Sequence, residues 1–259
     1  MERRFVLKEN GLQIPCVLNE PEYCNVRRCI IGVHGLCGSK DSKILVDIAE
    51  EMGLFGAATV RFDFPEHGDS PETDRALSLL QCQEALQAVV RWTKRAYPFV
   101  DMGIFATGFG AFVTLTALDD LRRIEEHLKL VLQTPDLSMD HTLLEMVGMT
   151  EQELQEAGCV SVGARTMRKV KVSYSFFEEL GGHMVYYNHY MPMLLLHGEQ
   201  DEVTPLSHLE PFRRFNPESK LVVIPGADHQ FRGEGQWDMV VDLTRDWFQC
   251  EQVLLCDWQ

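Results

Sequence analysis

The chain has 259 residues, of which 45% are hydrophobic and 24% are charged, an ordinary composition for one α/β domain with an insertion. No run of about 18 apolar residues occurs, so we expect no transmembrane helix and no membrane partner. The formal net charge is −15. Nucleic acid is therefore disfavoured as a partner, because a phosphate-binding surface needs clustered Lys and Arg.

The cysteines give no support for a metal site. Eight are spread along the chain without a CxxC pair, at Cys16, Cys24, Cys29, Cys37, Cys82, Cys159, Cys250 and Cys256. We expect neither a metal nor an organic cofactor. The N-terminal segment Met1–Phe5 lacks the apolar core of a signal peptide, so we expect a cytoplasmic protein with free thiols. The oligomeric state stays open, a homodimer included.

Short apolar runs alternate with longer segments that carry apolar residues at helical spacing. The predicted strands are 3–8, 12–18, 28–33, 57–62, 101–106, 128–133, 192–197 and 220–225, and the predicted helices are 42–54, 78–96, 109–121, 206–215 and 235–249. Asn10 and Gly11 are a strong hairpin turn signal between the first two strands, so the sheet should open with an antiparallel edge. Later strands are apolar throughout, which is typical of parallel strands covered on both faces. The pattern predicts an α/β fold with a mostly parallel eight-stranded sheet.

This alternation fails between residues 136 and 190. The stretch indicates two or three helices separated by glycines, and it is too long for a connecting loop. We predict a helical cap over 136–190, inserted into a core formed by 1–135 and 191–259.

Four segments follow predicted strands, where an open parallel sheet binds its ligands. They are His34–Gly38, Phe105–Ala111, His197–Pro205 and Pro225–Phe231. Taken singly, each segment can also be explained without a catalytic role. In chain order, they would be a tight turn, the start of a close-packed helix, an acidic surface turn and a loop with a structural histidine. Their order is more informative, because nucleophile, acid and then base is the order of α/β-hydrolase triads.

Each segment suits one catalytic task. A glycine-rich turn can point amide N–H groups at a developing oxyanion. Small residues at 106, 108 and 110 suit the sharp strand-to-helix turn called the nucleophile elbow. A carboxylate at Asp201 can orient an imidazole, and His229 can act as general base and then general acid.

As a set, these segments and Phe62–Ser70 resemble the cap-bearing α/β-hydrolases related to cinnamoyl/feruloyl esterases and the serine aminopeptidase-like group. The resemblance covers nearly the whole chain. It implies the α/β-hydrolase fold and hydrolysis of carboxylic esters through an acyl-enzyme. When the functional residues of the family are assigned to the matching positions of this sequence, Asp201 is the triad acid and His229 is the base. The backbone N–H groups of Leu36 and Phe109 then form the oxyanion hole.

The departure from this family is at the nucleophile position, where the family has serine and this chain has Gly108. No acyl-enzyme forms without a side-chain nucleophile, so the chain should be catalytically impaired. Thr107 should point away from His229, and Cys37 is better explained as a buried thiol. Gly108 is either natural, in a ligand-binding pseudoenzyme, or an engineered replacement of Ser. The retained acid and base favour the engineered form of an esterase, although acyltransferases and peptidases share the fold.

Aromatic residues in the predicted cap bear on substrate choice. They suit an aromatic or alicyclic acyl group, and packing between cap and core explains them equally well. They are Phe176, Phe177, Tyr186, Tyr187 and Tyr190. We expect a small-molecule ester to bind above Gly108, with His34, Cys37, Tyr186 and Tyr187 as candidate substrate-binding residues.

Overall fold

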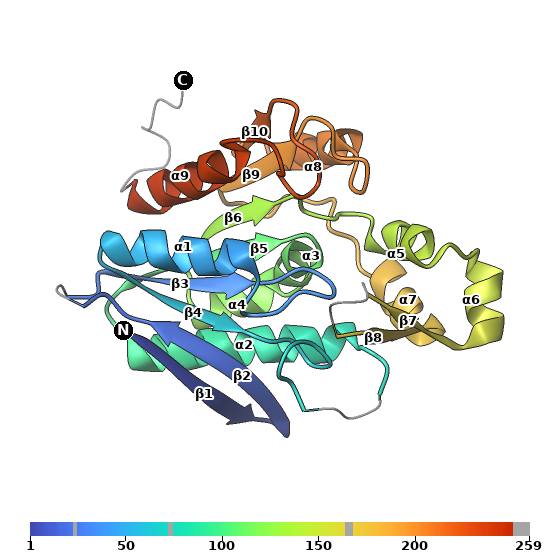
Figure 1. Ribbon diagram of the computed structural model, residues 1–259, viewed down its shortest axis with the longest axis horizontal. Coiled ribbons are helices and arrows are strands. Elements are labelled where there is room, and N and C mark those ends of the chain that lie inside the picture. Colours follow the sequence, from blue (N-terminus) through green and yellow to red (C-terminus); the bar gives the residue numbers. More distant parts are fainter. Residues whose placement is uncertain (23–24, 72–74, 164–167, 251–259) are drawn as a thin grey trace.

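The computed structural model describes residues 1–22, 25–71, 75–163 and 168–250. It contains a twisted sheet with helices on both faces and an inserted segment at one end of the strands (Figure 1). The sheet has eight strands in the order β1-β2-β4-β3-β5-β6-β9-β10. These are β1 (Glu2–Glu9), β2 (Leu12–Asn19), β3 (Arg28–Val33), β4 (Ala57–Phe62), β5 (Asp101–Thr107), β6 (Lys129–Gln133), β9 (Met193–Gly198) and β10 (Lys220–Ile224).

The predicted antiparallel edge is confirmed. β1 pairs antiparallel with β2, and β2 pairs antiparallel with β4, whereas the other pairings in the sheet are parallel. Asn10 and Gly11 form the hairpin turn with φ of 50° and 80°. Asparagine and glycine tolerate these left-handed backbone conformations better than other residues, so this pair sets the register of the edge.

Two hydrophobic clusters lie on the two faces of the sheet. Ile30, Phe105 and Leu194 belong to one cluster, whereas their neighbours Ile31 and Ile104 belong to the other. Successive side chains of a strand point to opposite faces, so strands covered on both sides need apolar residues at every position. This requirement explains the continuous apolar runs of the central strands.

The helices that cover these faces follow the prediction closely. α1 (Lys43–Leu54) and α9 (Gln236–Gln249) pack on one face, and α2 (Leu79–Ala96), α3 (Phe109–Thr116), α4 (Leu118–Ile124) and α8 (Leu209–Phe215) contribute to the other. The predicted helix 109–121 is in fact two helices that meet at Ala117, and the predicted helix 206–215 begins with a 3₁₀ turn at Leu206–His208.

The segment between β6 and β9 contains more than helices. It holds α5 (Met139–Val147), α6 (Glu151–Ala157) and α7 (Tyr174–Gly181), and also an antiparallel pair, β7 (Cys159–Val162) with β8 (Val170–Ser173). Residues 164–167 of the predicted cap lie outside the described residues. The sequence analysis missed the strand pair because each strand has four residues, too few for an alternating pattern to stand out.

The thiols differ from expectation at one position. Cys250 is disulfide-bonded, so the expectation of free thiols throughout is wrong there. The free cysteines of the described chain are Cys16, Cys29, Cys37, Cys82 and Cys159, and Cys24 and Cys256 lie outside the described residues. Across the described ranges, every helix is too short or too polar to cross a bilayer.

Gly103 on β5 offers a test of the packing between sheet and α9. A Cβ at this position would lie 2.4 Å from a ring carbon of Phe248, which is fully buried. We expect Gly103→Ala to lower the free energy of unfolding by about 1–3 kcal/mol, because a close-packed core resists an added methyl group. Urea unfolding measures this change.

Gly53 in α1 is the matched control, because a Cβ there meets no atom of the described chain within 4 Å. Gly53→Ala should be neutral or stabilising by up to ~1 kcal/mol, since alanine favours the helix. Equal effects of the two substitutions would contradict the packing described for Phe248.

Candidate functional site

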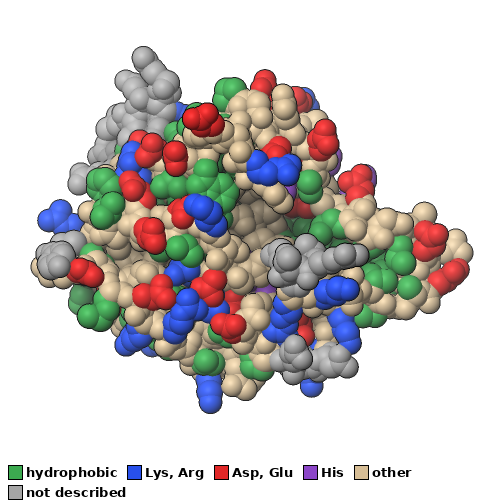
Figure 2. Space-filling model, viewed as in Figure 1, with side chains coloured by type: hydrophobic (Ala, Val, Ile, Leu, Met, Phe, Trp, Pro, Cys, Tyr) green, Lys and Arg blue, Asp and Glu red, His purple; other side chains and the backbone are tan. Residues whose placement is uncertain are grey.

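A pocket of about 760 Å³ lies at the carboxyl ends of β3, β5 and β6. Figure 2 shows a hollow near the centre of the view, with acidic and basic side chains interspersed around it. The lining of the pocket includes Leu36, Gly108, Phe109, Val203 and His229, which come from all four segments singled out in the sequence. The topology therefore brings residues far apart in the chain to one edge of the sheet, as expected for an open parallel sheet.

Gly108 forms the sharp turn between β5 and α3. Its backbone has φ 48° and ψ −116°, a combination that side-chain-bearing residues rarely adopt. The turn is held by its own amide, which donates to the Gln133 carbonyl at 3.0 Å, and by the Gly108 carbonyl, which accepts from Ala111 N at 3.1 Å. The sharp strand-to-helix turn expected from the sequence is therefore present, with glycine at its tip.

Gly110, two residues further on, allows α3 to begin so close to the sheet. A Cβ at Gly110 would lie 2.4 Å from the carbonyl oxygen of His34, at the end of the neighbouring strand. Only glycine fits this approach, and it brings the turn that contains Leu36 beside the tip of the elbow.

Asp201 and His229 form a hydrogen-bonded acid–base pair. His229 Nδ1 lies 2.8 Å from Asp201 Oδ2, and the Asp201 side chain is fully buried whereas the imidazole is about one-third exposed. No residue of the described chain hydrogen-bonds His229 Nε2, and the ring lines the pocket together with Gly108. The pair therefore has the arrangement of a general base oriented by a carboxylate.

The loop that carries Asp201 is organised around its carboxylate. Val203 N and Thr204 N donate to Oδ1 at 2.9 and 2.8 Å, and Thr204 Oγ1 donates to Oδ2 at 2.9 Å. Burial alone would raise the pKa of Asp201, but these bonds and His229 outweigh it and lower that pKa below the ordinary value. The carboxylate is thus held ionised beside the imidazole. His197 also stabilises the loop, because its Nε2 donates to the Thr204 carbonyl at 2.7 Å.

Two backbone amides can stabilise an oxyanion in the pocket. Leu36 and Phe109 both line it, and neither N–H donates a hydrogen bond to any described residue. Phe109 is the first residue of α3, where amide groups lack intrahelical acceptors. These are the two donors that the family resemblance implies, and the structure leaves both available.

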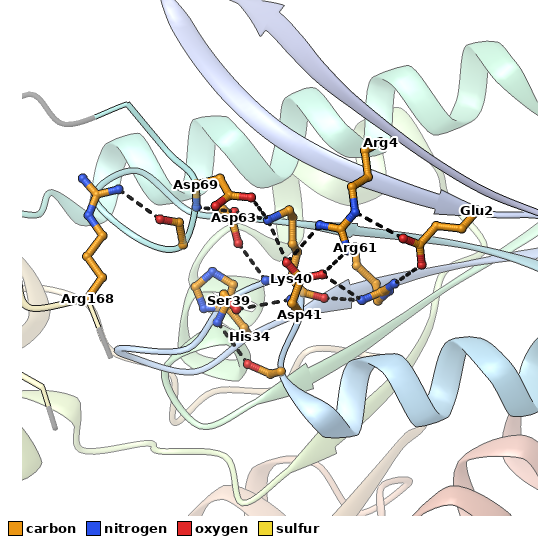
Figure 3. A network of polar contacts seen from close by, with 12 residues as sticks. Glu2, Arg4, His34, Ser39, Lys40, Asp41, Arg61, Asp63, Asp69 and Arg168 are labelled. Carbon is orange, nitrogen blue, oxygen red and sulfur yellow. Dashed lines mark hydrogen bonds and ion pairs between the residues drawn. The ribbon is translucent and has the colours of Figure 1, made fainter. Parts of the chain in front are cut away.

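A charged network around Lys40 and Asp63 fixes the position of the turn that follows β3 (Figure 3). Asp63 accepts from the Lys40 amide at 2.7 Å, from Lys40 Nζ at 2.9 Å and from the Asp69 amide at 2.8 Å. Burial alone would lower the pKa of Lys40, but its hydrogen bonds to Asp69, Asp63 and Asp41 raise it, so the ammonium stays charged. Asp63 therefore joins the turn after β3 to the loop after β4.

His34 does not line the pocket, contrary to the expectation that it binds substrate. It is buried, with Nδ1 2.7 Å from the Gly35 carbonyl and Nε2 accepting from Phe64 N at 3.1 Å. Both ring nitrogens are engaged by the backbone, and the Nε2 contact joins the turn after β3 to the loop after β4. Burial is the main cause that lowers the pKa of His34 to about 4, so this ring is neutral and structural.

Cys37 is also absent from the pocket lining. Its side chain is buried, and this burial raises the pKa of the thiol to about 11. A thiol in that state is a poor nucleophile at neutral pH, because the thiolate is the reactive form.

Tyr186 and Tyr187 lie away from the pocket lining as well. The Tyr186 hydroxyl is 3.1 Å from Ser138 Oγ, and Tyr187 is exposed, with its ring 4.2 Å from that of His189. Phe176, Phe177 and Tyr186 instead pack on the core, whereas Tyr190 is exposed. Phe176 is fully buried and meets Phe109 edge-on at 6.0 Å between ring centroids.

The inserted segment contributes to the pocket through α5, which the sequence analysis did not single out. Met139, Thr142 and Met146 line the pocket. Their spacing of three and four residues puts them on one face of a helix, which was the available signal. Asp136, directly before α5, also lines the pocket, and burial is the main cause that raises its pKa. Within the described chain, no group of three His, Cys, Asp or Glu side chains is arranged to hold a metal ion.

Comparison with solved structures gives close matches of fold. The chain is similar to Est1E from Butyrivibrio proteoclasticus, with 20% identity and a TM-score of 0.76 over 95% of this chain and 97% of that one. It is also similar to a putative hydrolase from Agrobacterium vitis, with 16% identity and a TM-score of 0.78 over 95% and 98% of the two chains. Mouse alpha/beta hydrolase domain-containing protein 10 matches with 16% identity and a TM-score of 0.75 over the same shares.

No protein-family model and no curated protein matches the sequence itself. Two further matching structures are described as an α/β serine hydrolase homologue and an α/β serine hydrolase. Together with the eight-stranded, mostly parallel sheet, these similarities show that the chain has the α/β-hydrolase fold. The fold implied by the sequence resemblance is confirmed.

The Asp63–Lys40 pair should matter for stability. The Asp63 side chain is fully buried and that of Lys40 is 3% exposed. We expect Asp63→Asn to lower the free energy of unfolding by about 3 kcal/mol, because removing one partner leaves a buried charge poorly compensated. Asp69→Asn is the control, since its side chain is 71% exposed and should cost less than ~1 kcal/mol. Similar losses in urea unfolding for both variants would contradict the role assigned to Asp63.

His34 and His67 should make the protein sensitive to mild acid. Burial lowers the pKa of His34 to about 4 and that of His67 to about 3, from an ordinary 6.5. Between pH 6.5 and these values the unfolded chain binds protons that the folded chain does not. The free energy of unfolding should therefore fall with falling pH, by up to ~1.4 kcal/mol per pH unit for each histidine.

Urea unfolding between pH 7 and pH 4.5 tests this expectation. His67→Gln should make the pH dependence less steep, whereas substitution of the exposed His127 by Gln should leave it unchanged. An unaltered slope in the His67 variant would show that the buried imidazoles do not cause the acid sensitivity.

Proposed function

We propose that the chain is a carboxylic ester hydrolase of the serine type whose nucleophile position holds Gly108. The carrying observation is the Asp201–His229 pair, bonded at 2.8 Å and lining the same pocket as Gly108. A purely structural role for this pair would not require the imidazole to face solvent, whereas general base catalysis does require it. Leu36 and Phe109 supply the oxyanion donors, so the machinery for acyl transfer lacks one side chain.

The substrate we propose is a small-molecule ester with an aromatic or alicyclic acyl group. The surface of the pocket is mainly apolar, with contributions from Leu36, Ile44, Met139 and Trp237, and its volume fits a small organic molecule. Est1E has been solved with ferulic acid bound, and ferulic acid is an aromatic acid of this size. In this proposal, residues 136–190 act as the cap, and α5 is the part of the cap that meets the substrate.

We interpret Gly108 as a replacement of an original serine. The Asp201 loop uses three hydrogen bonds from Val203 and Thr204 to hold one carboxylate toward His229. A protein that only binds a ligand gains nothing from this arrangement. The alternative is a natural ligand-binding protein with the same fold, and experiment has to distinguish it from an esterase that has lost its serine.

Gly108→Ser should have two opposed effects. Serine is strained at φ 48°, so the free energy of unfolding should fall by about 1 kcal/mol. The hydroxyl would enter a space where a Cβ meets no described atom within 4 Å, beside a prepared base. Because loss of a triad serine costs about 10⁶ in turnover in a serine protease, the gain in ester hydrolysis should be large.

Melting temperature and hydrolysis of a small activated ester and an aromatic ester measure the two effects. Asp201→Asn and His229→Gln in the serine background are the controls, and each should remove most of the new activity. A serine variant that stays inactive on a broad ester panel, while the glycine form binds a small aromatic acid tightly, would favour the binding protein.

A further inference from the structure

We propose that the chain with Gly108 transfers the acyl group of an ester directly to a small neutral nucleophile that sits beside Gly108 and is deprotonated by His229. The acceptor class is water, a short primary alcohol or hydroxylamine. This inference rests on the proposed function, and it adds an activity that needs neither a serine nor an acyl-enzyme.

The first step of the argument is the space at the elbow. A Cβ built on Gly108 has no described atom within 4 Å, and the position opens into the pocket. The surrounding backbone is independently held, since Gly108 N donates to Gln133 and Gly108 O accepts from Ala111. The turn therefore keeps its shape without a side chain, and a group of two or three heavy atoms fits where the side chain would be.

The second step is the base. Nδ1 of His229 is occupied by Asp201 at 2.8 Å, which fixes the tautomer with the proton on Nδ1 and the lone pair on Nε2. The buried carboxylate of Asp201 stabilises the imidazolium that forms when Nε2 takes a proton. The pair is thus a general base whose ordinary proton donor, a serine hydroxyl, is replaced by a molecule from solution.

The third step excludes neighbouring side chains as acyl acceptors. Cys37 is buried and does not line the pocket. The Thr107 hydroxyl lies 3.4 Å from the Cβ position of Gly35, on the side of the glycine-rich turn. The hydroxyl groups of Ser42, Thr134 and Thr142 also line the pocket. No side chain of the described chain, these included, hydrogen-bonds Nε2 of His229. The acceptor that meets the base therefore comes from solution.

The reaction balances without any further reagent. The nucleophile forms a bond to the acyl carbon as its proton passes to Nε2 of His229. The negative charge on the carbonyl oxygen is met by the N–H groups of Leu36 and Phe109. Collapse of the intermediate breaks the bond between the acyl carbon and the ester oxygen, and the leaving alkoxide takes the proton back from Nε2. One bond forms and one breaks, and no atom changes oxidation state.

Hydroxylamine is the probe, with a small aryl ester as acyl donor and the hydroxamic acid as the measured product. We expect the Gly108 protein to form hydroxamate at a rate that saturates with ester. His229→Gln should lower this rate by about 10²-fold or more, the usual contribution of general base catalysis. N-tert-butylhydroxylamine has similar chemistry but a larger volume, and it should react no faster than in the absence of protein.

Gly108→Ala is the matched control, because its methyl group fills the proposed acceptor space and leaves Asp201 and His229 unchanged. It should form hydroxamate at the rate of the His229→Gln protein. Melting temperature establishes that the variant is folded, and if it is not, the histidine variant and the bulky acceptor decide the question. Equal rates in the Gly108 protein and the His229→Gln protein would overturn direct transfer.

Activity of the Gly108→Ser protein on the same ester separates this inference from the proposed function. If the serine variant hydrolyses the ester and the Gly108 protein forms no hydroxamate above the His229→Gln rate, direct transfer is overturned and the esterase assignment stands. If neither protein acts on the ester, both proposals fail.

Discussion

Two close approaches between backbones bring the site together, and each depends on a glycine. Gly110 lets α3 start against the His34 carbonyl, where a Cβ would be 2.4 Å from the oxygen. Gly198, at the end of β9, lies equally close to the Ala227 carbonyl, again at 2.4 Å for a Cβ. The first contact places the elbow beside the turn of Leu36, and the second places the loop of Asp201 beside that of His229. Without both, the four segments would end at the same edge of the sheet but too far apart to share a pocket.

These contacts also explain how much could be predicted from the sequence. The central strands were predictable because buried parallel strands need apolar residues at every position. The antiparallel edge was predictable from the turn signal of Asn10 and Gly11. Asp201 and His229 were predictable as a pair because they follow strands in the order nucleophile, acid and base. The residues of α5 that line the pocket were not predictable, because the side of this helix that faces the pocket is determined only when the insertion folds.

His34, Tyr186 and Tyr187 were predicted to bind substrate, but none of them lines the pocket. For His34 and Tyr186 the physical reason is the same. A polar aromatic side chain near a functional motif can satisfy its hydrogen bonds within the protein, and sequence does not say which partner it finds. His34 uses both nitrogens on backbone groups of two loops, and Tyr186 reaches Ser138. Met139 and Met146 form the wall instead, as flexible apolar side chains that adapt to irregular shapes.

The ring contact between Phe109 and Phe176 links the inserted segment to the elbow from behind. Phe109 also meets Phe64 at 5.8 Å, and Glu179 of α7 accepts hydrogen bonds from Ser78 and Leu79 at the start of α2. The segment is thus fastened both to Phe109 and to the start of α2, so a movement of the segment would disturb the first residue of α3. A molecule that enters therefore meets a preformed wall, to which Met146 of α5 and Val203 of the Asp201 loop both contribute.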